Sequence, residues 1–339
     1  MMTGQVFMET QSLLEVKRLQ TAFRTDGGII RALDGVSFGV APGKTLAVVG
    51  ESGCGKSVTA MSIMGLVQEA NGFIESGEIL FKGKNLAEIA ENDKEQMRTI
   101  RGNDISMIFQ EPMTALNPVF TVGDQISEVF RIHRKMSRSE ARKASLRMLE
   151  MVSIPDAEKR LDEYPFQLSG GMRQRIVIAM ALACEPELLI ADEPTTALDV
   201  TIQAQILRLM KNLQNKNQTS IIFITHDLGV VAEIADYVVV MYAGKAVEYA
   251  KVEEIFANPQ HPYTKGLIRS IPTLDISKDQ KLHTIEGTVP GLKNLPNGCR
   301  FNTRCSLAAE RCFKDVPVME DIADGHQVAC HKIKGASKA

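Results

Sequence analysis

The sequence feature that most constrains the fold is the eight-residue stretch Gly50–Ser57, which follows the apolar run Thr45–Val49 and precedes Val58–Met64. The apolar run predicts a buried strand, and the residues after the stretch predict the start of a helix. A glycine-rich loop between a strand and a helix lets successive backbone N–H groups point into one concavity, where the helix N-terminus adds positive dipole. The pattern therefore predicts a phosphate-binding loop and disfavours the alternative, a tight turn without a ligand.

Every residue of this loop is a candidate for nucleotide binding. The candidates are Gly50, Glu51, Ser52, Gly53, Cys54, Gly55, Lys56 and Ser57. In loops of this kind the lysine, here Lys56, reaches the β- and γ-phosphates, and the hydroxyl group of Ser57 ligates Mg²⁺.

Length and charge narrow the class of protein. The chain has 339 residues, enough for about two domains. A net charge of −2 gives no support to nucleic-acid binding. No window holds 18 consecutive apolar residues, so no membrane-spanning helix is predicted. The N-terminus lacks a basic stretch followed by an apolar one, so we expect the protein to remain in the cytosol.

Continuous apolar strands alternate with helical patterns through most of the chain, which predicts an α/β fold with a parallel sheet covered on both faces. Strands are expected at residues 13–23, 32–40, 46–49, 78–81, 105–109, 188–193, 220–225 and 237–242. A charged stretch with helical spacing, from Pro112 to Tyr164, predicts a helical insertion, and capping residues at Ser137–Glu140 predict a helix start within it.

Polar residues stand at the ends of three of these strands. Asp192 is placed to hold Mg²⁺, and Glu193 to orient and deprotonate an attacking water. A solvated acidic turn is the alternative, and the phosphate-binding loop makes it less favoured. Gln110 could contact Mg²⁺ and the water, and His226 follows another strand. Either residue alone would be assigned a packing role, but α/β sheets bind ligands at these strand ends.

A second element suited to phosphate binding is Ser169-Gly170-Gly171, which directly precedes a predicted helix. Because the first loop already occupies one side of a nucleotide, this element suggests binding to the nucleotide of another subunit. A serine-capped helix N-terminus without a ligand is the alternative.

The order of these motifs resembles that of the ATP-binding cassette (ABC) family over about residues 12–255. The motifs are the P-loop at Gly50–Ser57, Gln110, the signature at Leu168–Met172, Asp192 with Glu193, Ala197-Leu198-Asp199, and His226. The resemblance implies a P-loop NTPase (RecA-like) core with an antiparallel β subdomain and a helical subdomain at about 112–168. It also implies a head-to-tail dimer that sandwiches two ATP molecules with Mg²⁺. Met172 departs from the usual glutamine, and the residue that stacks on adenine is open among Phe23, Ile30 and Arg31.

Two segments, Gln110–Pro118 and Asn258–Thr264, look like the oligopeptide and dipeptide importers within this family. That resemblance implies an ATPase subunit on the cytoplasmic face of a bacterial membrane. The implied partners are a second, related ATPase chain (or an identical one), two transmembrane permease subunits and, indirectly, an external solute-binding protein. Three alternatives stay open: an importer of nickel or another small solute, an ABC ATPase not coupled to transport, and a regulatory module that hydrolyses ATP poorly.

Four cysteines, Cys299, Cys305, Cys312 and Cys330, gather in the predicted C-terminal region, residues 256–339. In a reducing cytosol such a group suggests a metal rather than disulfides. The gaps between them lack the two-residue spacing typical of zinc sites. Spacing alone leaves zinc and an iron–sulfur cluster open, with free thiols as a less favoured alternative. The family resemblance favours a [4Fe–4S] cluster with all four thiolates as ligands.

Overall fold

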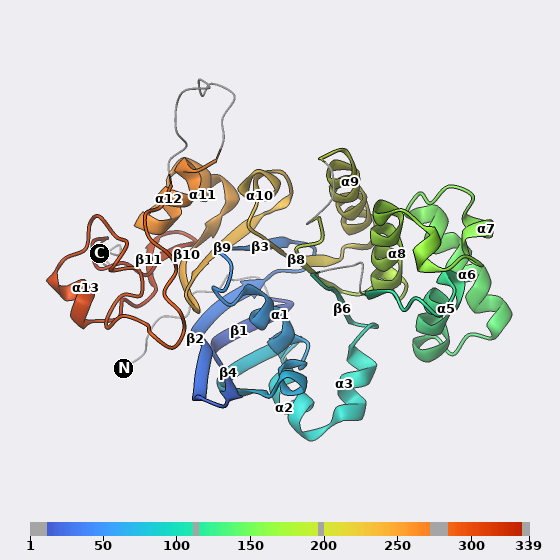
Figure 1. Cartoon of the computed structure of the whole chain (residues 1–339), viewed down its shortest axis with the longest axis horizontal. Helices are drawn as coiled ribbons and strands as arrows, with labels where there is room; N and C mark the ends of the chain where they lie inside the picture. The colour runs from blue at the N-terminus through green and yellow to red at the C-terminus, as the bar shows by residue number, and fades with distance from the viewer. Residues whose placement is uncertain (1–11, 111–114, 196–199, 272–283, 334–339) are drawn as a thin grey trace. The chain divides into compact units, whose positions relative to one another are not determined.

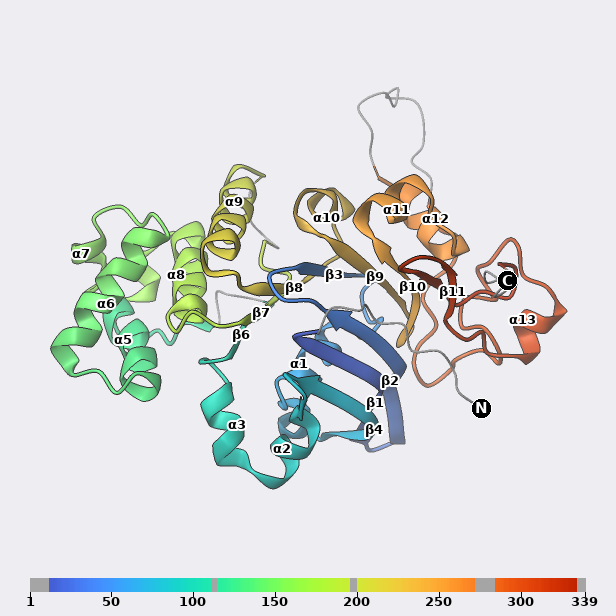
Figure 2. The ribbon, with the colours of Figure 1, turned by 180° about the vertical axis from the view of Figure 1, so that it is seen from behind.

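The structure is a computed structural model that describes residues 12–110, 115–195, 200–271 and 284–333. The chain forms two compact units, residues 1–87 with 225–339, and residues 88–224. Figures 1 and 2 show the chain from opposite sides. The Ala197-Leu198-Asp199 motif lies outside the described residues.

The N-terminal part of the first unit forms an antiparallel sheet in the order β2-β1-β4-β5. Its strands are β1 (Leu14–Thr25), β2 (Gly28–Val40), β4 (Gly72–Phe81) and β5 (Lys84–Asn85). Figure 1 shows β1, β2 and β4 side by side. The strands expected at residues 13–23 and 32–40 pair as a hairpin, with Thr25 opposite Gly28, and β4 begins earlier than the expected residue 78. Alternate residues of β1 are buried, so this sheet covers the unit with one face.

A larger sheet in the first unit contains the strand that leads into the P-loop. Its strands are β3 (Thr45–Val49), β9 (Tyr237–Tyr242), β10 (Lys245–Lys251), β11 (Glu320–Ala323) and β12 (His326–Val328). β3 pairs with β9 in parallel, and all of its residues are buried, as expected for a strand covered on both faces. β10, β12 and β11 then continue the sheet with antiparallel pairing, which the sequence did not predict.

The helices of the first unit bring the C-terminal residues into its core. They are α1 (Lys56–Ile63), η1 (Val67–Ala70), α10 (Leu228–Ile234), α11 (Val252–Ala257), α12 (Pro262–Arg269) and α13 (Glu310–Lys314), with α2 (Leu86–Asn92) starting where the unit's first segment ends. The rings of Tyr242 and Tyr263 lie 4.7 Å apart between centroids, and those of Tyr242 and Phe301 5.1 Å. All three side chains are buried, so β9, α12 and the segment around Phe301 share one aromatic core.

The second unit contains three parallel strands in the order β8-β7-β6: β6 (Ile105–Ile108), β7 (Leu188–Asp192) and β8 (Ser220–Thr225). Its helices are α3 (Lys94–Ile100), α5 (Val122–His133), α6 (Arg138–Met151), α7 (Ala157–Arg160), η2 (Pro165–Gln167), α8 (Gly170–Leu182) and α9 (Val200–Asn217). α5, α6 and α8 pack against one another (Figure 2). The expected helical subdomain is therefore present between β6 and β7.

Local side-chain contacts define where helix α6 begins. The hydroxyl oxygen of Ser137 accepts the N–H of Glu140 at 3.3 Å, and the Glu140 carboxylate accepts the N–H of Ser137 at 2.9 Å. This reciprocal capping box satisfies two donors that the helix itself leaves unpaired. The start predicted at Ser137–Glu140 is thereby confirmed.

Replacement of this cap tests its contribution to stability. Ser137→Ala should destabilise the second unit by about 1 kcal/mol, because the N–H of Glu140 loses its acceptor. The measurement is the thermal unfolding midpoint of the full chain. Ser139→Ala, at an exposed position in the same turn, is the matched control and should leave the midpoint nearly unchanged. Equal midpoints for the two variants would contradict the capping role.

Candidate functional site

The P-loop has the backbone that a phosphate cradle requires. Gly50 and Gly55 have φ values of 152° and 103°. A Cβ atom on Gly50 would lie 2.2 Å from the carbonyl oxygen of Met241, and one on Gly55 would lie 2.6 Å from a methyl group of Leu33. Only glycine fits either position. Because the cap position at Gly55 supplies no side-chain hydrogen bond, the first N–H groups of α1 are left for an anion.

Lys56 lies folded over this loop. Its ammonium group is buried and donates to the carbonyl oxygens of Gly50, at 2.8 Å, and Glu51, at 3.2 Å. Ser57 follows it in the first turn of α1 and is half-buried. The cradle, the lysine and the hydroxyl group together fit a phosphate chain with Mg²⁺.

Two contacts to the P-loop come from residues that the sequence analysis missed. The backbone N–H of Glu51 donates to the phenolic oxygen of Tyr263 at 2.9 Å. The Glu51 carboxylate forms an ion pair with Arg304, also at 2.9 Å. Tyr263 falls within the importer-like segment 258–264, but no sequence signal pointed to Arg304.

A second group of predicted residues lies in the second unit, at the ends of β6 and β7. Asp192 is buried as the last residue of β7. Glu193 follows with φ 47°, a conformation that costs energy for any residue except glycine, and its N–H donates to the carbonyl oxygen of Ile224 at 2.9 Å. The amide of Gln110 donates to the Glu193 carboxylate at 3.3 Å, so the structure brings these two predicted residues together.

The signature element caps helix α8. The hydroxyl oxygen of Ser169 accepts the N–H of Met172 at 3.3 Å, and helix α8 begins at Gly170, so the two glycines belong to the helix that they were expected to precede. A Cβ atom on Gly171 would approach Ile202 of α9 to 3.2 Å, so the glycine allows close packing. On the same helix, Gln174 donates to the carbonyl oxygen of Pro194, directly after Glu193.

His226 belongs to the first unit, as does the P-loop, whereas Gln110, Asp192, Glu193 and the signature belong to the second. His226 is exposed directly after β8, and the neighbouring Asp227 caps α10. The structure therefore describes two partial sites, each by itself.

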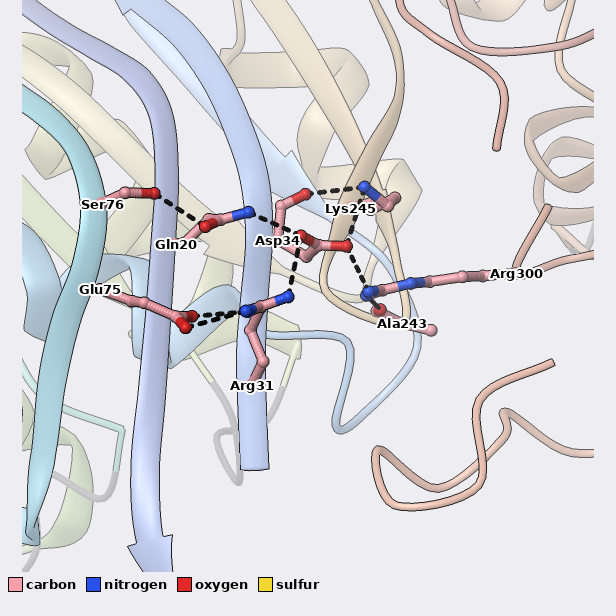
Figure 3. Close-up of polar contacts among 8 residues, drawn as sticks. All are labelled: Gln20, Arg31, Asp34, Glu75, Ser76, Ala243, Lys245 and Arg300. Carbon is pink, nitrogen blue, oxygen red and sulfur yellow. Dashed lines mark hydrogen bonds and ion pairs between the residues drawn. The ribbon is translucent and has the colours of Figure 1, made fainter. Parts of the chain in front are cut away.

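The adenine candidates lie on the β1–β2 hairpin, where Phe23 pairs with Ile30. Arg31 forms two hydrogen bonds to Glu75, at 2.6 and 2.9 Å, and lies 3.8 Å from Asp34 (Figure 3). Asp34 also binds Lys245 and Arg300, at 3.0 and 2.6 Å. These ion pairs connect β2 to β4, to the start of β10 and to the C-terminal segment.

The predicted metal cluster is wrong. Among the residues that the structure describes, which include all four C-terminal cysteines, no group of three or more His, Cys, Asp or Glu side chains is placed to hold a metal ion. This overturns both the [4Fe–4S] cluster and the zinc alternative.

The physical reason for this correction is packing. Cys299 and Cys305 pack against the apolar core of the first unit, as small hydrophobic side chains do. The pKa of the Cys299 thiol is raised to about 11, mainly by burial and in smaller part by the nearby Cys312, Cys330 and Cys305. Burial also raises the pKa of Cys305 and Cys330. Metal ligation needs thiolates, whereas these surroundings favour neutral thiols.

The described part of the chain contains no helix that is both long and apolar enough to span a membrane. Two family models match the sequence: ABC transporter at residues 33–196, and oligopeptide/dipeptide transporter, C-terminal region, at residues 247–312.

Curated relatives match nearly the whole chain. The dipeptide transport ATP-binding protein DppD of Bacillus subtilis is 56% identical over 320 residues, covering 94% of each chain. A putative peptide import ATP-binding protein of Brucella ovis is 55% identical over 330 residues, covering 95% of this chain and 98% of the relative.

Solved structures agree with the fold. MJ0796, a bacterial ABC transporter cassette solved as a dimer, is 27% identical with a TM-score of 0.63, covering 70% of this chain and 98% of that one. The ABC transporter component cbiO1 of Clostridium perfringens is 29% identical with a TM-score of 0.61, covering 73% and 91%. The chain therefore belongs to the ABC transporter family of ATP-binding proteins.

Proposed function

We propose that this chain is the ATP-hydrolysing subunit of a bacterial importer for dipeptides and oligopeptides. The observation that supports this most directly is its 56% identity, over 94% of its length, to a dipeptide transport ATP-binding protein. The match of residues 247–312 to an oligopeptide/dipeptide transporter region points to the same substrate class.

In this proposal the P-loop binds the phosphates of ATP. The N–H groups of Gly50–Ser57 surround the phosphates, and Lys56 exchanges its two loop carbonyl acceptors for β- and γ-phosphate oxygens. Ser57, Gln110 and Asp192 would hold Mg²⁺. That ion, when bound, neutralises the negative charge that develops on the phosphates.

Glu193 is the proposed general base for the water that attacks the γ-phosphate. Gln110 donates to its carboxylate and so holds one of its oxygens in a fixed direction. His226 is proposed to contact the γ-phosphate.

The signature residues Ser169, Gly170 and Gly171 are proposed to bind the nucleotide of a second ABC ATPase chain in a head-to-tail dimer. The dimeric solved structure of the cassette MJ0796 supports this assembly. We also propose that the dimer lies on the cytoplasmic face of the membrane and binds two permease subunits, which receive peptide from an external solute-binding protein.

The proposed domain division follows function. Residues 12–255 form the ATPase domain, with the helical subdomain at about 112–168, and residues 256–339 form the transporter-specific C-terminal region. The two family matches fall mostly on either side of this boundary, at 33–196 and 247–312.

Loss of the P-loop lysine tests nucleotide binding. Lys56→Ala should weaken ATP binding about 10- to 100-fold, because a charged contact to phosphate is lost in the ground state and the transition state alike. Calorimetric titration with ATP measures this. Lys44→Ala, directly before β3, where Lys44 pairs with Asp236, is the control and should keep normal affinity. Unchanged affinity in Lys56→Ala would remove the basis for the P-loop assignment.

Loss of the base tests hydrolysis. Glu193→Gln should bind ATP normally and hydrolyse it about 10²- to 10⁴-fold more slowly, since the amide cannot accept the proton of water. Phosphate release by the assembled complex, with the partner ATPase site also disabled, is the measurement. Glu187→Gln, just before the start of β7, should keep full turnover. Near-normal rates for Glu193→Gln would show that another group is the base.

Substrate class is tested on the purified complex. The chain should co-purify with integral membrane proteins, and proteoliposomes containing the complex and its external binding protein should take up radiolabelled dipeptide when ATP is enclosed. Uptake of Ni²⁺ without peptide would contradict peptide import. Purification without any membrane protein would favour an ATPase that is not coupled to transport.

A further inference from the structure

A residue far along the chain contacts the P-loop directly. Arg304 lies 253 positions after Glu51, and both belong to the first unit. One guanidinium nitrogen of Arg304 donates to the two carboxylate oxygens of Glu51, at 2.9 and 3.2 Å. The Arg304 side chain is only 4% exposed, whereas that of Glu51 is 31% exposed. The contact therefore joins a buried cation to a partly exposed carboxylate of the P-loop.

The position of Arg304 is fixed from several directions. Its Nε donates to the carbonyl oxygen of Glu286 at 2.9 Å, and a terminal nitrogen donates to that of Ile285 at 3.2 Å. Its guanidinium carbon lies 5.7 Å from the ring centroid of Tyr242. A guanidinium group held by two carbonyl oxygens and an aromatic face has little freedom to move away from Glu51.

Tyr263 holds the backbone of the same P-loop residue. Its phenolic oxygen accepts the N–H of Glu51 at 2.9 Å, and its ring is completely buried against Tyr242 and Phe301. Glu51 is thus held through its main chain by Tyr263 and through its side chain by Arg304. We name these two residues, Tyr263 and Arg304, the Glu51 clamp.

The clamp matters because Glu51 is an acidic residue inside a loop that binds an anion. An unpaired carboxylate beside the phosphates would repel them, most strongly at low salt. Arg304 offsets that charge and orients the carboxylate toward the C-terminal segment. The carboxylate of Glu51 is then paired and oriented before nucleotide binds, which lowers the free-energy cost of binding.

We propose that Arg304, assisted by Tyr263, is a positioning residue for nucleotide binding, and that it acts through Glu51. This inference rests on the proposed ATP site and makes the C-terminal region part of that site. Arg304 itself is not expected to touch the phosphates.

The test is a double-mutant cycle on the full-length chain. Affinity for a non-hydrolysable ATP analogue with Mg²⁺ is measured by calorimetric titration, so that no turnover occurs, for the wild type, Arg304→Ala, Glu51→Gln and the double variant. Arg304→Ala should weaken ATP binding about tenfold, because it leaves the Glu51 carboxylate unpaired beside the phosphates. In the Glu51→Gln background the same substitution should change the affinity less than about threefold, because the charge that Arg304 offsets is already gone.

A matched control uses the other anchored arginine of the same segment. Arg300 pairs with Asp34 on β2 rather than with the P-loop (Figure 3). The effect of Arg300→Ala on affinity should be the same in the wild-type and Glu51→Gln backgrounds. If Arg304→Ala does not fold, as judged by thermal unfolding, Arg304→Lys replaces it; it keeps the charge but not the forked geometry and should lose less affinity.

The outcomes separate this inference from the proposed function. Equal losses of affinity from the Arg304 substitution in both backgrounds, or no loss in either, would overturn the inference. Binding of ATP by the wild type would still support the proposed ATP site in that case. A wild-type chain that does not bind ATP would overturn both. Dependence of the loss on Glu51, without such dependence for Arg300, supports the clamp.

Discussion

The P-loop half of the nucleotide site, which lies in the first unit, depends on two close contacts. At each of them the loop backbone approaches its neighbours more closely than a side chain allows. Gly50 lies against the carbonyl oxygen of Met241 at the end of β9, and Gly55 lies against Leu33 of β2. Both residues also have positive φ values, 152° for Gly50 and 103° for Gly55, which favour glycine. The loop therefore takes its shape in part from packing within the first unit. A site organised in this way loses little conformational freedom when phosphate binds.

The charges around the loop follow the same principle. Lys56 is buried, and the carbonyl oxygens of Gly50 and Glu51 accept its protons. A phosphate chain can take the place of these acceptors without a large movement of the lysine. Glu51 brings a negative charge that this exchange does not need, and Arg304 pairs with it on the side of the C-terminal segment. Lys56 and Glu51 thus each have a partner. Loss of that partner would leave Lys56 as a buried cation without an acceptor, or Glu51 as an unpaired anion.

Local signals predicted most of the fold. Fully buried apolar strands such as β3 and the capping box at Ser137 are read from a few neighbouring residues, and Gln110 and Glu193 were both expected at strand ends. The Arg304 contact could not be predicted, because no local pattern relates residues 253 positions apart. The prediction that the cysteines bind metal was wrong because it rested on a local pattern. Their spacing suggests ligands, but whether a thiol binds metal or packs against a core depends on its three-dimensional surroundings.

A buried carboxylate also connects the C-terminal region to the rest of the first unit. Glu248 of β10 accepts hydrogen bonds from His326 at 2.8 Å and from the N–H groups of Gln260 and His261 at 2.7 and 2.8 Å. Burial alone would raise its pKa, but these hydrogen bonds hold the pKa below the usual value, so Glu248 stays charged. Burial lowers the pKa of His261 to about 4, and its neutral ring accepts the N–H of Tyr263, at the start of α12. Because Tyr263 in turn accepts the N–H of Glu51, the hydrogen bonds that begin at Glu248 end at the P-loop.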